Sequence, residues 1–128
     1  SAQAVEQLMQ VEVPERAEII RVIFLELSRL ASHLLWLGTS ALELNMSSVF
    51  MYCFAEREKI LDIFENYSGA RMFPNSWRIG GLNRDLNPGF EEEVRSFLKA
   101  FPRAWKDFDN LLTENYVWCE RLKDVGII

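Results

Sequence analysis

The feature that most constrains the fold is a helical pattern that runs from Pro14 to about Leu44. At about 100° per residue, apolar side chains occupy one broad side of this segment and charged side chains occupy the other. The apolar side comprises Ile20, Phe24, Leu27, Leu30, Ala31, Leu34, Leu35, Gly38 and Ala41. The polar arc comprises Glu15, Glu18, Arg21, Glu26, Arg29, His33 and Glu43. A glycine inside a helix costs about 1 kcal/mol relative to alanine, so Gly38 indicates that another backbone packs closely there.

Three further helices are expected from the remaining pattern. Residues 49–67 follow turn residues Asn45, Ser47 and Ser48, and Gly69 is the expected end of this helix. The next helix starts at Asn87 and Pro88, keeps apolar spacings of three and four, and is expected to be kinked or divided at Pro102. A short helix spans residues 116–123. The sequence therefore predicts an all-α bundle of three long helices plus a short C-terminal helix, in one domain over residues 1–128.

One long loop, residues 69–90, interrupts the helices. It shows neither helical nor strand periodicity, and it contains four glycines, two prolines and three asparagines. Its arginines Arg71, Arg78 and Arg84 against Asp85 give a net charge of +2, while the other residues have 11 basic and 18 acidic side chains, a net charge of -7. Loops longer than about 12 to 15 residues are uncommon in compact domains and are often functional. The positive charge of the chain is thus concentrated at a candidate interaction site.

Composition excludes several classes of protein. The net charge of -5 argues against a nucleic-acid binder, which needs a cationic face. Between Leu30 and Ala55 the only formal charge is Glu43, but polar residues divide this stretch into runs shorter than the roughly 20 residues that cross a bilayer. No targeting segment is visible at the start of the chain. We therefore expect a soluble segment without a transmembrane helix.

Residues suited to catalysis are scarce. Cys53 and Cys119 are distant in sequence and have no nearby histidine, so we expect two reduced, buried thiols and no metal site. The single histidine, His33, is expected to be an ordinary hydrogen-bonded side chain. Glu43 stands alone in an apolar stretch near a helix end. Burial would suit it to proton transfer, but it could equally reach solvent or an arginine of the loop.

Several segments, in order along the chain, resemble the large quinone-site subunit of respiratory complex I, which is itself similar to the large subunit of nickel-iron hydrogenases. The resemblance covers most of the chain. Its motifs are VPERA at 13–17, ELSRLASHL at 26–34, LGT at 37–39, ALE at 41–43, FAEREKILDIF at 54–64, SGARM at 68–72 and RIGG at 78–81. Because the family protein is much longer, we expect this chain to be an internal fragment of such a subunit.

The resemblance implies roles for five residues. Thr39 matches a threonine that lines the quinone cavity, Glu43 matches an acidic residue that couples quinone chemistry to protonation, and Phe50 falls in the same cavity wall. Arg71 matches an arginine close to the terminal iron-sulfur cluster of a partner subunit. Phe73 stands where the family has a histidine beside that cluster. Phenylalanine cannot titrate as imidazole does, so we expect the cluster potential to be nearly independent of pH at this position.

The implied function is that of a part of a proton-pumping NADH:quinone oxidoreductase, a translocase, on the cytoplasmic face of the membrane. The chain itself is expected to bind no cofactor, while the iron-sulfur cluster belongs to a partner subunit and quinone is the substrate. Its partners would be other complex I subunits. Alone, the fragment is expected to be inactive and to self-associate through uncovered apolar faces. Two alternatives are a non-catalytic helical interaction module and the large subunit of a membrane-bound nickel-iron hydrogenase.

Overall fold

A computed structural model describes residues 2–72 and 75–127 and is mostly helical. The elements in chain order are α1 (Ala2–Met9), α2 (Glu15–Glu43), α3 (Ser47–Ser68), β1 (Trp77–Arg78), β2 (Gly81–Leu82), α4 (Phe90–Leu112) and α5 (Tyr116–Leu122). Three long helices and a short C-terminal helix are therefore present, as predicted. The prediction of a purely α-helical fold was wrong in one respect, because β1 and β2 pair as a small antiparallel hairpin inside the long loop. Helix α1 was not predicted.

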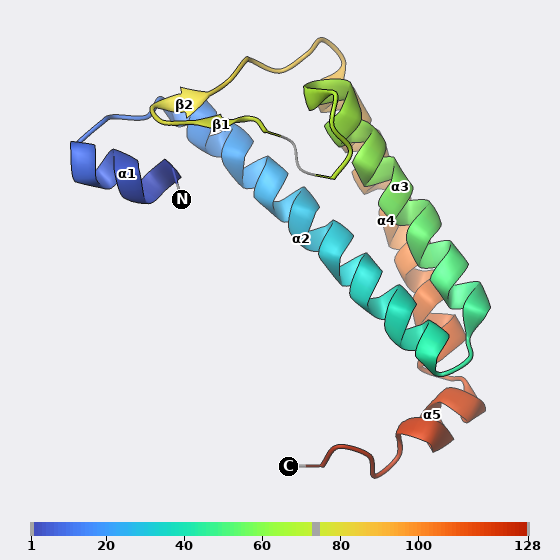
Figure 1. The fold of residues 1–128 in the computed structure, drawn as a ribbon. Coiled ribbons are helices and arrows are strands. Elements are labelled where there is room, and N and C mark those ends of the chain that lie inside the picture. The colour runs from blue at the N-terminus through green and yellow to red at the C-terminus, as the bar shows by residue number, and fades with distance from the viewer. Residues whose placement is uncertain (1, 73–74, 128) are drawn as a thin grey trace.

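Helices α2, α3 and α4 run alternately in opposite directions and form the body of the molecule (Figure 1). Asn45 makes the turn between α2 and α3 with φ of 65°, in the left-handed region. At Gly38 the two helices come close, since a Cβ atom there would lie 3.2 Å from Cβ of Cys53. The close backbone packing predicted from Gly38 is confirmed.

The core contains a group of aromatic rings where α2, α3 and α4 meet. The ring of Phe24 lies 5.8 Å from Phe64, 4.6 Å from Tyr67 and 5.4 Å from Phe90, measured between centroids. All four residues are buried. Aromatic pairs at these separations are favourable beyond the area they bury. This group joins the start of α4 to the hairpin of α2 and α3.

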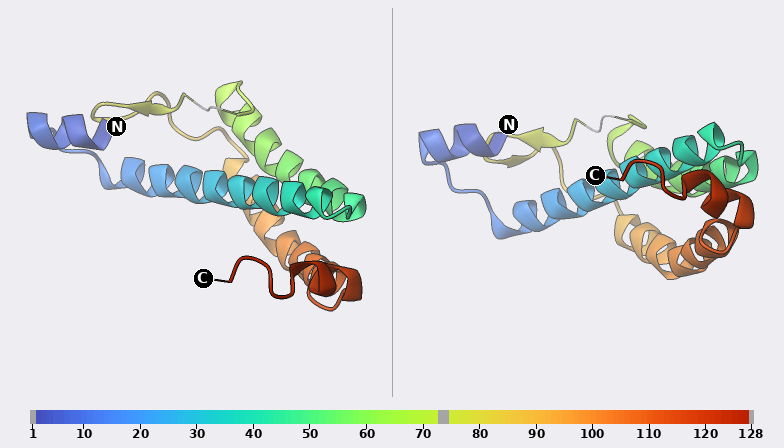
Figure 2. Two further views of the ribbon diagram at one scale, coloured as in Figure 1. Left: turned by 60° about the horizontal axis from the view of Figure 1, so that its bottom comes forward. Right: turned by 90° about the horizontal axis from the view of Figure 1, so that it is seen from below.

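The ends of the helices agree with the sequence within a few residues. Gly69 ends α3 in the left-handed conformation, as predicted. The start of α4 differs, because Gly89 rather than Asn87 is the residue that precedes its first turn. Pro102 does not divide α4, which is continuous and follows a curved path in Figure 2. Helix α5 lies near the turn between α2 and α3, where Arg121 donates a hydrogen bond to the carbonyl of Leu44.

One residue of the predicted polar arc of α2 lies in the interior. Arg21 is 2% exposed and forms an ion pair with Glu6 of α1, which is 5% exposed. The arc was inferred from helical periodicity, which treats every charge as solvated. Periodicity along α2 contains no information about a partner from another helix. The placement of Arg21 on the surface was therefore wrong.

The two cysteines have different environments, so the prediction of two buried thiols was wrong for one of them. Both are free; Cys53 is buried and Cys119 is exposed. Burial raises the pKa of the Cys53 thiol to about 11. At pH 8 we expect iodoacetamide to modify Cys119 quickly and Cys53 only after unfolding, because the thiolate is the nucleophile. Mass spectrometry of the native and the urea-unfolded chain measures this.

The matched control for this labelling is Cys119→Ser, which is expected to leave no rapidly modified thiol in the native chain. Incorporation of two equivalents at similar rates under native conditions would contradict the burial of Cys53.

Candidate functional site

Thr39 and Glu43 lie on the last turns of α2. They are four residues apart and therefore share one side of the helix. The Thr39 hydroxyl donates to the carbonyl of Leu35 at 2.9 Å, which fixes the side chain against its own helix. Thr39 is half-buried, whereas Glu43 is exposed. Of the two interpretations of Glu43, the structure agrees with the one in which its carboxylate reaches the surface.

Phe50 belongs to the first turn of α3, just after the turn that follows Glu43. It is half-buried and its ring stacks on Phe54, with centroids 4.3 Å apart. The Phe54 ring in turn lies where Gly38 lets α2 and α3 approach closely, 3.4 Å from a Cβ atom placed on Gly38. The structure therefore brings the three predicted quinone-cavity residues to the same end of the helical hairpin.

Arg71 lies at the opposite end of α3, two residues beyond Gly69. Its guanidinium donates to Asp62 at 3.0 Å, to Glu65 at 2.6 Å and to Glu58, all on one face of α3. The hydrogen bonds to Glu65 and Asp62 are the main reason that the pKa of Arg71 is raised. A helix of 22 residues rises about 33 Å. Arg71 and the group around Glu43 are thus separated by the length of α3, and Phe73 lies outside the described residues.

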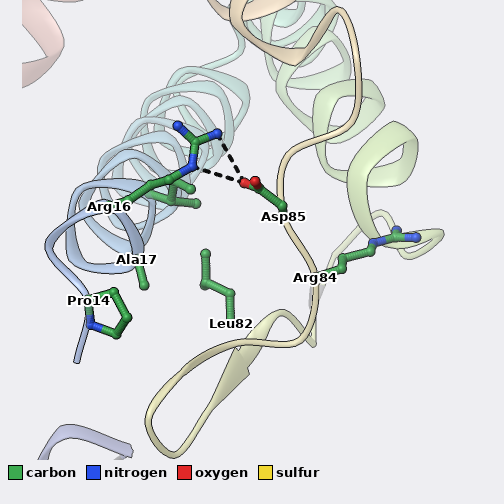
Figure 3. Close-up of a pocket in the computed structure, with 7 residues that line it drawn as sticks. Pro14, Arg16, Ala17, Leu82, Arg84 and Asp85 are labelled. Carbon is green, nitrogen blue, oxygen red and sulfur yellow. Dashed lines mark hydrogen bonds and ion pairs between the residues drawn. The ribbon is translucent and has the colours of Figure 1, made fainter. Parts of the chain in front are cut away.

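The segment that follows the β1–β2 hairpin is attached to the start of α2. Arg16 donates two hydrogen bonds to Asp85, at 3.2 and 3.1 Å, across a hollow of about 230 Å³ (Figure 3). The backbone N–H of Leu86 and then Arg16 lower the pKa of Asp85. Arg84 also lines the hollow, but its guanidinium points away from it in Figure 3 and lies 5.2 Å from the Tyr67 ring. Four of the seven residues that line the hollow are apolar, and the two polar side chains that meet there, Arg16 and Asp85, bind each other.

A second hollow, of about 290 Å³, lies between α2 and α4. It is lined by Leu30, His33, Leu34, Trp36, Leu37, Phe101 and Trp105. The predicted role of His33 as an ordinary side chain is compatible with its exposed position on the rim. Among the described residues, no three His, Cys, Asp or Glu side chains are grouped so that they could hold a metal ion.

Sequence reasoning missed the buried pair of Glu6 and Arg21 and the hairpin beside it. The hairpin did have a signal, the Gly80–Gly81 dipeptide, because both residues have positive φ angles, 86° and 154°. The ion pair of Glu6 and Arg21 left no such signal in the sequence, since Glu6 lies in a helix that the hydrophobic pattern did not indicate. In the part of the chain that the structure describes, no helix is long and apolar enough to cross a membrane.

Comparison with known proteins shows which family the chain resembles. The family model described as "Respiratory-chain NADH dehydrogenase, 49 Kd subunit" matches residues 43–128. An NADH-quinone oxidoreductase subunit of Protochlamydia amoebophila is 66% identical over 127 residues, which is 99% of this chain and 32% of that protein. An NADH-quinone oxidoreductase subunit of Solibacter usitatus is 51% identical over 125 residues, 98% of this chain and 34% of that protein. The chain thus spans about a third of the length of the relatives it matches.

Proposed function

Because the chain belongs to the family of the 49 kDa subunit of the respiratory-chain NADH dehydrogenase, we propose that it forms part of the quinone site of an NADH:quinone oxidoreductase. The observation that supports this most strongly is the 66% identity with an NADH-quinone oxidoreductase subunit over almost the whole chain. The proposal places the chain in the peripheral arm, on the cytoplasmic face of the membrane. Its partners are other subunits of the complex, above all the one that holds the terminal iron-sulfur cluster.

The group around Glu43 is suited to the quinone side of this site. Thr39 and the aromatic side chain of Phe50 are half-buried at this end of the hairpin of α2 and α3, and Glu43 adds one exposed carboxylate. A carboxylate at the edge of an apolar wall can accept and release protons while the wall excludes water from a bound ring. We propose that Glu43 exchanges protons with the quinone site, and that Thr39 and Phe50 shape the cavity.

Arg71 is suited to the other side of the site. The partner's cluster, when bound nearby, supplies single electrons; Arg71 contributes positive charge that favours the reduced, more negative cluster. The three carboxylates of α3 hold its guanidinium in place and together carry more charge than it does, so an effect on the cluster depends on the guanidinium itself lying nearer to the cluster than they do. In this proposal the chain places a proton-exchanging group and a cationic group at the two ends of α3.

The substitution Glu43→Gln tests the proposed function in the assembled complex. It removes the titrating group and keeps the shape of the side chain. We expect the NADH:quinone reductase rate to fall by about tenfold or more, because a positioned acid or base contributes about 10²–10⁴-fold. The rate of NADH oxidation by ferricyanide, which bypasses quinone, is expected to be unchanged.

The matched control is Glu92→Gln on α4, also an exposed carboxylate. It is expected to leave both rates at the level of the unmodified complex. If Glu43→Gln and Glu92→Gln gave the same quinone reductase rate, Glu43 would have no part in proton exchange and the proposed function of this site would be rejected.

A further inference from the structure

A buried ion pair joins the first two helices. Glu6 of α1 and Arg21 of α2 are almost completely buried. Two nearly parallel hydrogen bonds connect their side chains, from Nη1 to Oε2 at 2.9 Å and from Nη2 to Oε1 at 2.6 Å. Such forked pairs between guanidinium and carboxylate fix distance and orientation together. Helix α1 is therefore held on α2 in one defined orientation.

The same two side chains also bind the backbone of the β1–β2 hairpin. Nη2 of Arg21 donates to the carbonyl of Arg78 at 2.9 Å and to the carbonyl of Gly81 at 2.8 Å. Oε1 of Glu6 accepts a hydrogen bond from the N–H of Gly80 at 2.8 Å. Both strands and the turn between them are thus bound by one ion pair.

The environment keeps both partners charged. The hydrogen bond from Arg21, assisted by the N–H of Gly80, lowers the pKa of Glu6 although burial acts in the opposite direction. The bond to Glu6 raises the pKa of Arg21. The guanidinium also lies 5.5 Å from the centre of the Trp77 ring, on the side of β1. Because charged hydrogen bonds are directional, this contact holds the β1–β2 hairpin in one position on α2. An apolar contact of the same size has no such directionality and would not do this.

The other attachments of this loop are weaker or lie further along the chain. The hydroxyl of Tyr67 donates to the carbonyl of Arg84 at 2.8 Å, beyond the hairpin. Arg16 and Asp85 have side chains that are each 68% exposed, so water and salt screen their attraction. Among these attachments of the loop, the pair of Glu6 and Arg21 is therefore the one that is both buried and charged and that binds the β1–β2 hairpin directly.

We propose that Glu6 and Arg21 are positioning residues for quinone reduction: they fix the β1–β2 hairpin, which carries Arg78, in the orientation that the partner's cluster requires. The inference rests on the proposed function. The two side chains act through the backbone of Arg78, Gly80 and Gly81, so their proposed role is one of positioning. An arrangement that misplaces the loop by about 1 Å would slow the reaction without removing any reacting group.

Arg21→Lys in the full-length protein, within the assembled complex, tests the inference. Lysine keeps the charge but cannot form the forked bond to Glu6 and the two backbone bonds together. Per assembled complex, we expect the quinone reductase rate to fall about tenfold or more and the electron paramagnetic resonance spectrum of the terminal cluster to change. Amide hydrogen exchange at Gly80 is expected to become at least about tenfold faster. The NADH–ferricyanide rate is expected to be unchanged.

Arg29→Lys is the matched control, an exposed arginine on the same helix, and is expected to behave as the unmodified complex. Glu6→Gln, which keeps the size of the side chain, is expected to reproduce the effects of Arg21→Lys. If both variants kept the quinone reductase rate per assembled complex and the cluster spectrum of the unmodified protein, the inference would be overturned, whatever the yield of complex. Such a result would leave the proposed function intact, because that function is tested separately by Glu43→Gln.

Discussion

Replacing Phe24 by alanine is expected to lower the free energy of unfolding of the chain by about 3–5 kcal/mol. Phe24 is 2% exposed and its ring contacts rings from α3 and α4. Removing it opens a cavity at the point where all three long helices meet, and the surrounding rings can fill that cavity only in part. Urea unfolding followed by far-ultraviolet circular dichroism measures the change as a lower midpoint.

Leu25→Ala is the control for this measurement, because Leu25 is the next residue of α2 and is 48% exposed. Its replacement is expected to change the free energy of unfolding by less than about 1 kcal/mol. Equal losses for the two variants would mean that the aromatic group is not the centre of the core.

The substitution Gly38→Leu is expected to lower the free energy of unfolding by about 1–3 kcal/mol. Already the first added atom would lie 3.2 Å from Cβ of Cys53 and 3.4 Å from the Phe54 ring. The remaining atoms of leucine have no room unless α2 and α3 move apart. Leucine also stabilises a helix by nearly 1 kcal/mol relative to glycine. The measured loss of unfolding free energy is therefore the steric cost of the larger side chain minus this gain. The same urea unfolding experiment measures it.

Ser32→Leu places the same side chain on the exposed side of α2 and separates the steric effect from helix propensity. It is expected to leave the stability unchanged or slightly raised. If Gly38→Leu were as stable as Ser32→Leu, the close approach of α2 and α3 would not exist in solution.

The long helices could be predicted because each buries one continuous side, and a period of 3.6 residues makes that side visible in the sequence. Gly38 even indicated a point of close approach between α2 and α3. The hairpin could not be predicted in this way, since strands of two residues are too short to show alternation. Helix α1 has only eight residues and depends on the contact of Glu6 with a residue 15 positions later. Contacts between distant residues leave no periodic trace.

The candidate site was predictable to a different extent. The family resemblance named Thr39 and Glu43, and the structure has both on the last turns of α2. The carboxylates around Arg71 could have been expected, because Glu58, Asp62 and Glu65 repeat at helical spacing just before it. What would face Glu43 and Arg71 in the proposed complex depends on other chains. No property of this sequence specifies those surfaces.

The alternating course of α2, α3 and α4 also has a consequence for the order of folding. Each long helix packs against the next one in the chain, and α2 is joined to α3 by a turn of a few residues. Such local pairing forms quickly, because little chain entropy is lost in bringing the partners together. During synthesis, the hairpin of α2 and α3 can close while α4 is still inside the ribosome. The β1–β2 hairpin would then settle on the start of α2, a helix that is already paired with α3.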